Sequence, residues 1–231
     1  MPVANKLSSE ERRTAIIQAV RRVFAEKGFH GTTTRELAKA AGVSEALLFK
    51  HFPNKEALYL AMMRFCCQEK NPEMAERMNA LEPSTSTLVL LVHLLATHLV
   101  GGNAKSEDED LALQPRLQLR SLSEDGEFAR LFLERATSHW MQKVEESIEA
   151  AIAAGDAVPG PATPNLRAWF MHHLAAMVMI HLLPPTPAVD YGAPREKLVE
   201  PVVWFALRGM GLKDEAIKRH YNPRTLALLM N

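Results

Sequence analysis

The sequence predicts an all-α protein in two parts, a small N-terminal helical domain followed by a larger helical domain. Apolar residues recur at helical spacing along the 231-residue chain. No stretch alternates apolar and polar residues over several positions, as a half-buried strand would. Segments rich in glycine, proline or charge separate the apolar stretches. Hydrophobic residues make up 47% and charged residues 23%, which is ordinary for a globular protein.

The first predicted helix has Ile16, Val20 and Phe24 on one face, spaced as helix turns require. Ser8 and Glu11 have the spacing of a capping box at its start. Because the helical pattern ends before a glycine-rich segment, we expect the helix to end near residue 28.

Two short helices then follow with almost no connection. Thr33 and Glu36 have capping-box spacing and begin one helix, which Gly42 ends. Ser44 can cap the next helix, which runs to about His51. Since only three or four residues separate these helices, they must cross steeply, which is the geometry of a helix-turn-helix.

The rest of the chain is predicted to be helical as well. Pro53 and Asn54 separate the third helix from a long fourth helix, from Lys55 to about Met78. This pattern places the domain boundary after residue 54, giving domains 1–54 and 55–231. Later helices are expected over residues 84–100, 109–122, 126–154, 165–183, 195–211 and 213–220, with a short one after Pro223.

The charge distribution favours a polyanion-binding head. Residues 1–60 contain ten Lys or Arg and six Asp or Glu, an excess of four positive charges. The remaining residues carry an equal excess of negative charge. A basic module joined to an acidic body is typical of nucleic-acid binding, although an excess of four alone does not exclude chance.

Other features indicate a cytoplasmic protein that does not enter membranes. The N-terminus lacks the apolar core of a secretory signal. Cys66 and Cys67 are adjacent, which makes a poor disulfide pair and favours core packing. Residues 168–183 are apolar except for three histidines, but the stretch is short for a bilayer span, so a buried helix is preferred.

The most specific motif lies in residues 28–58. It reads Thr-Thr-x-x-Leu-Ala from residue 33, Ala-Gly-Val-Ser from 41, aromatic-x-His-Phe from 49 and Lys-Glu-Ala-Leu from 55. This segment resembles the DNA-binding region of the TetR family of bacterial regulators. The resemblance implies a three-helix helix-turn-helix domain followed by a helical ligand-binding and dimerisation domain. It also implies a homodimer on a palindromic double-stranded operator.

The physics of a helix-turn-helix assigns roles within this segment. The first residues of the second helix meet base edges in the major groove, where Glu45 can accept from a cytosine amino group. A phosphate at the start of the fourth helix would meet both free N–H groups and Lys55, which matches the family's phosphate-contacting lysine. The predicted DNA-binding residues are Thr34, Arg35, Ser44, Glu45, Ala46, Leu47, Phe49, Lys50, His51 and Lys55.

Some of these residues have a structural alternative. Thr33, Thr34, Ser44 and Asn54 can serve as helix caps. Core packing is favoured for Leu48 and Phe52, and Leu47 suits packing and DNA contact equally. The family commonly has tyrosine where this chain has Phe49, so the phosphate bond of that hydroxyl is lost or replaced here.

By resemblance, the larger domain binds a small molecule and pairs with a second subunit through the helices at about 165–183 and 195–211. Apolar residues in these helices need a cover, which a two-fold interface would supply. They are Trp169, Phe170, Met177, Val202, Val203, Phe205 and Met210. The candidate residues for the ligand pocket, each equally well explained as ordinary core or surface, are Met62, His93, Arg116, Arg120, Trp140 and His173.

The sequence offers no signal for catalysis. No histidine pair has the spacing of a zinc motif, and neither a nucleotide-binding glycine loop nor a nucleophile elbow occurs. We therefore expect no metal, no cofactor and no enzymatic activity. The leading hypothesis is a ligand-released transcriptional repressor. The alternative is an all-helical enzyme or small-molecule-binding protein whose N-terminal bundle is only structural.

Overall fold

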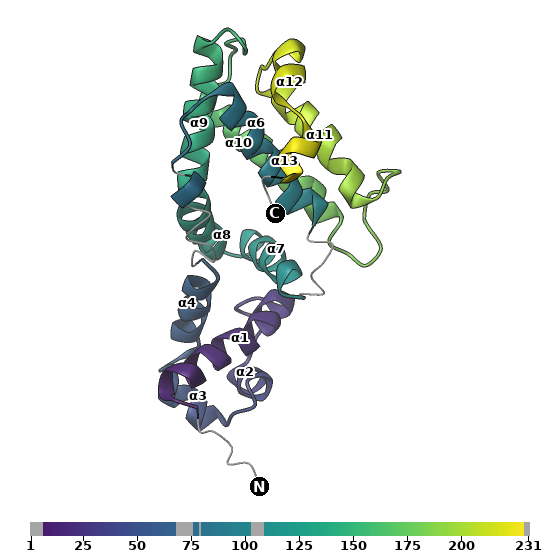
Figure 1. Ribbon diagram of the computed structural model, residues 1–231. Helices are drawn as coiled ribbons and strands as arrows, with labels where there is room; N and C mark the ends of the chain where they lie inside the picture. The colour runs from purple at the N-terminus through teal and green to yellow at the C-terminus, as the bar shows by residue number, and fades with distance from the viewer. Residues whose placement is uncertain (1–6, 68–75, 79, 103–108, 229–231) are drawn as a thin grey trace. The chain divides into compact units, whose positions relative to one another are not determined.

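The computed structural model describes residues 7–67, 76–78, 80–102 and 109–228. Every regular element within these residues is a helix, which confirms the predicted all-α class (Figure 1). The chain divides into two compact units, one of residues 1–70 and 108–137 and one of residues 71–107 and 138–231. Packing alone does not say where DNA-binding function ends, so the boundary after residue 54 stays a prediction.

The first unit combines the N-terminal helices with a later segment of the chain. A shared apolar core holds it together, and the first, second and fourth helices each contribute to that core. Its helices are α1 (Ser9–Lys27), α2 (Thr34–Ala40), α3 (Glu45–His51), α4 (Lys55–Cys66), α7 (Glu109–Leu122) and α8 (Glu127–Phe132), with one π-helical turn at Leu133–Thr137.

Local sequence signals begin these helices as predicted. Ser8 and Glu11 form a complete capping box at α1, and Thr33 and Glu36 form one at α2. The side chain of Asn54 accepts from the Ala57 N–H at the start of α4, at 2.7 Å. Satisfying these N–H groups stabilises each helix start by about 1 kcal/mol.

The core of the first unit is built from the predicted apolar stripe. Phe24 of α1, Leu37 of α2 and Phe52 after α3 are almost completely buried. Leu117 of α7 and Phe128 of α8 belong to the same core, although they lie far along the sequence. The core that includes Leu48 and Phe52 is therefore built from segments far apart in the sequence.

The predicted long fourth helix is wrong in its described part. α4 ends at Cys66, and the N–H of the following residue, Cys67, donates to the Met63 carbonyl at 3.0 Å. The predicted continuation through residues 68–75 lies outside the described residues. Pro72 is the sequence signal against a continuous helix, because proline clashes with the preceding turn.

The second unit is a helical bundle around its own core. Leu91 and Val92 of α6 pack there with Val144 and Ile148 of α9 and Val203 of α11. The bundle consists of α6 (Thr85–Ala96), a π-helical turn (Thr97–Gly101), α9 (Ser138–Ala153), α10 (Pro164–His181), α11 (Arg195–Gly209), α12 (Asp214–His220) and α13 (Pro223–Leu228).

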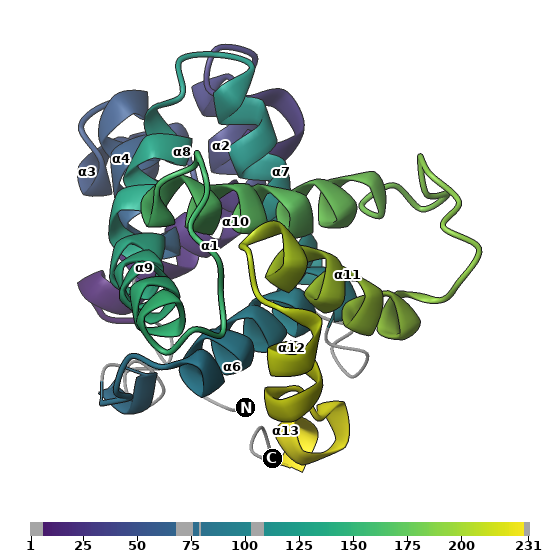
Figure 2. The same cartoon turned by 90° about the horizontal axis from the view of Figure 1, so that it is seen from above.

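The later helices agree with the prediction except in detail. The helix expected over 126–154 is divided by the π-helical turn at Leu133–Thr137 into α8 and α9. In Figure 2 the connection between α10 and α11, residues 182–194, extends away from the helices. No helix among the described residues is long and apolar enough to cross a membrane.

Both cysteines fit the core-packing interpretation. Cys66 and Cys67 are buried in the first unit, and neither forms a disulfide. Burial raises the pKa of the Cys67 thiol to about 11, so it stays protonated near neutral pH.

Candidate DNA-binding interface

The turn between α2 and α3 is fixed by backbone hydrogen bonds. The Gly42 N–H donates to the Lys39 carbonyl at 3.1 Å, and the Val43 N–H donates to the Ala38 carbonyl at 3.0 Å. This pairing is the Schellman motif, which needs a left-handed residue after the helix. Gly42 supplies it, with φ of +63°. Ser44 then caps α3 by accepting from the Leu47 N–H at 3.2 Å.

One side of α3 is anchored in the core. Leu48 and Phe52 are 2% and 1% exposed, which confirms their predicted packing role. At the other end of α3, Arg13 of α1 donates to the His51 carbonyl at 2.6 Å. Its guanidinium also lies 4.2 Å from the centre of the Phe52 ring. A cation here satisfies a free carbonyl and favours the helix dipole.

The opposite side of α3 faces solvent. Ser44, Glu45, Ala46 and Lys50 are exposed, and Phe49 is 42% exposed although it is a large apolar residue. A row of exposed side chains on a helix anchored from behind is what entry into a major groove requires. Leu47 and His51 are half-buried, so each of them can still serve packing or DNA contact.

The start of α2 adds further groups beside α3. Arg35 is exposed, whereas Thr34 is half-buried. The Thr34 hydroxyl donates to the carboxylate of Glu45 at 2.8 Å. Two of the predicted DNA-binding residues are thus brought together, although eleven positions separate them in the sequence.

Lys55 makes contacts within the protein that the sequence did not predict. Its ammonium donates to the carbonyls of Phe29 and Thr32, both at 2.9 Å. It also lies 4.3 Å from the centre of the Phe29 ring. Lys55 therefore braces the loop between α1 and α2, in addition to any contact with phosphate.

The charges of this unit are partly neutralised internally. Lys27 forms an ion pair with Glu36, and that contact, with hydrogen bonds from Thr33, lowers the pKa of Glu36 to about 2.

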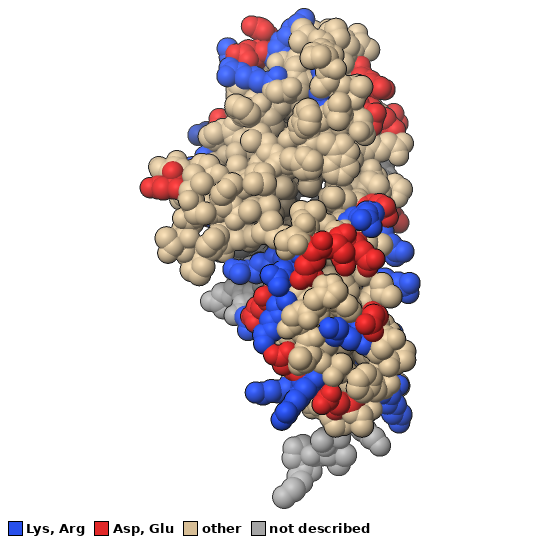
Figure 3. Space-filling view, turned by 180° about the vertical axis from the view of Figure 1, so that it is seen from behind, with Lys and Arg blue, Asp and Glu red and all other residues tan. Residues whose placement is uncertain are grey.

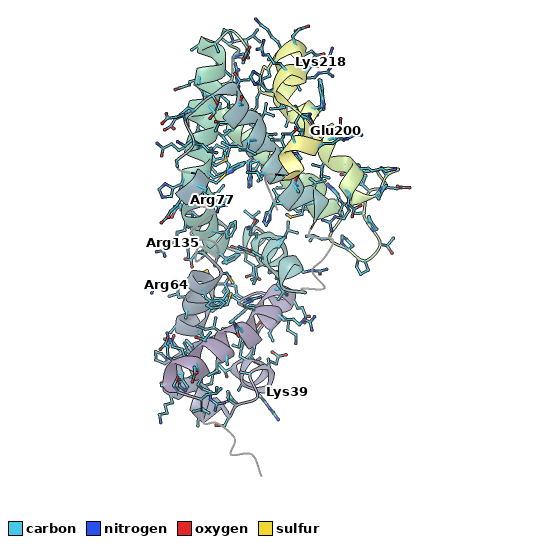
Figure 4. All side chains as sticks on the ribbon, viewed as in Figure 1. Lys39, Arg64, Arg77, Arg135, Glu200 and Lys218 are labelled. Atoms are coloured by element: carbon cyan, nitrogen blue, oxygen red, sulfur yellow. The ribbon has the colours of Figure 1, made fainter. Side chains whose placement is uncertain are left out.

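Lys39 of α2 points away from the helices in Figure 4. In Figure 3 Lys and Arg side chains project from the unit that contains α3. Exposed cations such as Arg35, Lys39 and Lys50 are suited to phosphate contacts.

Helix α7 holds the end of α1. Arg120 donates to the Lys27 carbonyl at 3.0 Å and forms a salt bridge with Glu124, also at 3.0 Å. The Glu124 carboxylate accepts from the Phe29 N–H at 3.3 Å. Gly28 leaves the space that these two side chains occupy, because a Cβ there would clash with both. Sequence analysis missed Arg13 and Glu124, since nothing local marks their partners.

The candidate pocket residues are divided between the two units. Met62, Arg116 and Arg120 belong to the first unit, and His93, Trp140 and His173 belong to the second. Met62 and His93 are buried in separate cores, while His173 is exposed. Burial lowers the pKa of His93, which lies 3.5 Å from the Tyr221 hydroxyl. Their role in ligand binding stays a prediction.

An apolar surface runs along α10 and α11. Phe170 and Phe205 are 61% and 69% exposed, and Met177 is also exposed. In Figure 3 the face of the second unit turned to the viewer has few charged side chains. An apolar hollow of about 230 Å³ lies on this unit, lined by Leu174, Val178, Tyr191, Leu198, Pro201, Val202 and Phe205.

Two residues predicted for the subunit interface do not belong to this surface. Val203 and Met210 are 0% and 1% exposed, because they pack in the core of their own unit. Trp169 and Val202 are half-buried. Both helices carry exposed apolar residues, but the helical period could not separate their inner from their outer face.

Comparison with known proteins places this geometry among bacterial regulators. Residues 16–62 match the model for "Bacterial regulatory proteins, tetR family". The repressor AcnR of Corynebacterium diphtheriae is 42% identical over 64 residues, 28% of this chain and 34% of AcnR. The repressor Rv1474c of Mycobacterium tuberculosis is 31% identical over 137 residues, 59% of this chain and 64% of that protein. This chain thus spans less than two thirds of either relative.

The fold likeness extends further along the chain than the sequence likeness. The structure of AibR in complex with isovaleryl coenzyme A and operator DNA matches with a TM-score of 0.59. The match covers 84% of this chain and 97% of AibR, at 19% sequence identity. It shows that both units follow one known architecture.

Proposed function

Because residues 16–62 match the model of the TetR family of bacterial regulatory proteins, we propose that this chain is a homodimeric transcriptional repressor of that family. Each subunit inserts α3 into the major groove of a palindromic operator. Residues 1–54 bind DNA, and residues 55–231 provide effector binding and dimerisation. The protein acts by binding, without catalysis, and works in the cytoplasm, where bacterial DNA lies.

The exposed face of α3 is the observation that carries this proposal. Glu45, Ala46 and Lys50 project from a short helix whose opposite side is fixed by Leu48 and Phe52. A helix held in this way offers side chains to base edges without bending, so sequence can be read directly. Arg35 and Lys50 supply the phosphate contacts that fix the register on the duplex.

A two-fold dimer follows from the apolar surface of α10 and α11. Phe170, Met177 and Phe205 are too exposed for a stable monomer surface, and a second copy would bury them. Two heads related by a two-fold axis read two half-sites of a palindrome.

The effector is proposed to act by shifting an equilibrium. AibR was solved with isovaleryl coenzyme A and operator DNA, so a protein of this architecture holds both kinds of ligand. In this chain a small molecule bound in residues 55–231 would favour a dimer in which the spacing of the two DNA-binding domains no longer fits DNA. A preference of a few kcal/mol for one state is enough to change occupancy strongly.

The test is a selection from random duplexes with the full-length chain, followed by fluorescence anisotropy at several salt concentrations. The wild type should enrich a palindromic sequence. Lys50→Ala should weaken binding and reduce the salt slope by about 0.9 for each phosphate that the lysine neutralises. Lys218→Ala, an exposed lysine of α12 in the other unit, is the matched control and should bind as the wild type does. Absence of any enriched sequence, or equal effects of the two variants, would refute the proposal.

A further inference from the structure

Glu45 is an unusual residue for a surface that approaches phosphates. It is exposed at the first position of α3, and no cation pairs with it among the described residues. Glu36, the other carboxylate nearby, is neutralised by Lys27. A carboxylate without a cation partner is repelled by the DNA backbone, so on this surface it is better suited to hydrogen-bond donors on base edges than to phosphates.

Of the four bases, cytosine suits a carboxylate best. Cytosine presents the N4 amino group as a donor in the major groove, and glutamate accepts from it. Adenine also presents an amino group, but its neighbouring N7 is an acceptor and repels a carboxylate. Glu45 therefore favours a C·G pair at the position that it meets, if α3 enters the groove as proposed above.

Thr34 holds one oxygen of the Glu45 carboxylate. Its hydroxyl donates to Oε2 of Glu45 at 2.8 Å, while no partner of Oε1 is present in the described part of the chain. Thr34 is not needed to cap α2, because Thr33 forms the capping box. The contacts between α2 and α3 bring these two helix starts together.

We propose that Thr34 is a specificity-determining residue, which orients the Glu45 carboxylate so that its free oxygen accepts from a cytosine amino group. This inference rests on the proposed function. It adds a residue, Thr34, that affects base preference indirectly, through Glu45. Holding one side chain in place before binding changes affinity about two- to tenfold, since ordering it otherwise opposes binding. Thr34 should therefore alter the preference at one base pair and leave the others unchanged.

The experiment measures base preference at each position of the selected operator with five variants of the full-length chain. Thr34→Val keeps the shape and removes the donor, so the preference for C·G at one position of each half-site should fall about two- to tenfold. Thr34→Ser keeps the hydroxyl and should restore it. Glu45→Gln should shift the preference at the same position toward adenine, which glutamine reads through the N6 and N7 groups of that base.

The last two variants, Glu45→Ala alone and Glu45→Ala combined with Thr34→Val, separate positioning from direct contact. If Thr34 acts through Glu45, Thr34→Val should have no further effect on base preference in a Glu45→Ala background. Uniform weakening by Thr34→Val across all sequences would overturn the inference and indicate a phosphate contact by Thr34 instead. Failure of the wild type to select any sequence would overturn the proposed function together with this inference. Thermal unfolding of each variant identifies any loss of folding.

Discussion

At the scale of single residues, the interface depends on side chains that hold other groups in place. Arg13 satisfies the last carbonyl of α3, and Lys55 holds two carbonyls of the loop between α1 and α2. Thr34 binds Glu45 directly. Each of these side chains acts on the position of α2 or α3 without needing to touch DNA itself.

Lys55 can be tested for two separate roles, because it has a structural role beside its predicted phosphate contact. Lys55→Met keeps the aliphatic stem and leaves the carbonyls of Phe29 and Thr32 without their donor. We expect the free energy of unfolding to fall by about 1–3 kcal/mol, the usual penalty for an unsatisfied partly buried group. The salt slope of DNA binding should also fall by about 0.9 for each phosphate that Lys55 neutralises. Urea unfolding and anisotropy measure the two effects separately, and an unchanged stability would exclude the bracing role.

His172 predicts a pH dependence of stability. Burial, with a smaller effect of His173, lowers the pKa of His172 to about 4, and its Nδ1 atom is buried without a hydrogen-bond partner in the described structure. Between pH 6.5 and 4 the unfolded chain binds a proton that the folded chain does not. The free energy of unfolding therefore falls as the pH falls through this window, by up to about 3 kcal/mol.

His172→Gln should remove this part of the pH dependence, measured by urea unfolding at pH 7 and pH 4.5. His139→Gln, an exposed histidine of α9, is the control and should keep the wild-type dependence. The interpretation fails if His172→Gln loses as much stability on acidification as the wild type does.

At the scale of elements, helix starts were predictable and helix partners were not. Ser8 with Glu11, and Thr33 with Glu36, lie three residues apart, so a short stretch of sequence contains the whole interaction. Glu124 lies 95 residues from its partner Phe29, and nothing near either residue marks the pair. Likewise, the helical period identified α10 and α11 but assigned the buried Val203 to the interface.

The contact between α7 and the end of α1 gives a prediction at this scale. Gly28 has a φ of +71° and faces Glu124 and Arg120, whereas Gly42 has a φ of +63° with open space around it. Gly42→Ala should therefore lose only the cost of a left-handed alanine, about 1 kcal/mol. Gly28→Ala places an alanine at φ +71° and ψ 179°, a region essentially restricted to glycine, and must also displace the ends of the Glu124 and Arg120 side chains. We therefore expect a loss of about 3 kcal/mol in urea unfolding. Equal losses would contradict this extra cost at Gly28.

At the scale of the whole molecule, recognition of a palindrome needs two DNA-binding domains held together. The helix-turn-helix was predictable because caps, a glycine turn and apolar spacing all lie within about twenty residues of one another. The subunit surface is less local, because it depends on which side of α10 and α11 the bundle covers. Phe170 and Phe205 identify that surface through their exposure.

A charged residue in the apolar surface of α10 and α11 should dissociate the dimer and separate its two DNA-binding domains. We expect Phe205→Glu to convert a dimer to a monomer in sedimentation velocity, because a carboxylate cannot be buried there unpaired. Operator affinity should fall strongly, since the second half-site no longer binds at high effective concentration. Leu122→Glu changes a residue of similar exposure on α7, 66% against 69%, and should leave both measurements unchanged. A monomeric wild type would rule out this arrangement.

The central claim is that the exposed face of α3 lies against DNA, and Ala46 tests it most directly. Ala46 is exposed at the second position of α3, so Ala46→Asp should leave thermal unfolding nearly unchanged. We expect the variant to lose about a hundredfold or more in affinity for the selected operator in fluorescence anisotropy, because an added carboxylate meets phosphates and acceptor-rich base edges. A folded Ala46→Asp protein that binds the operator as tightly as the wild type would contradict it.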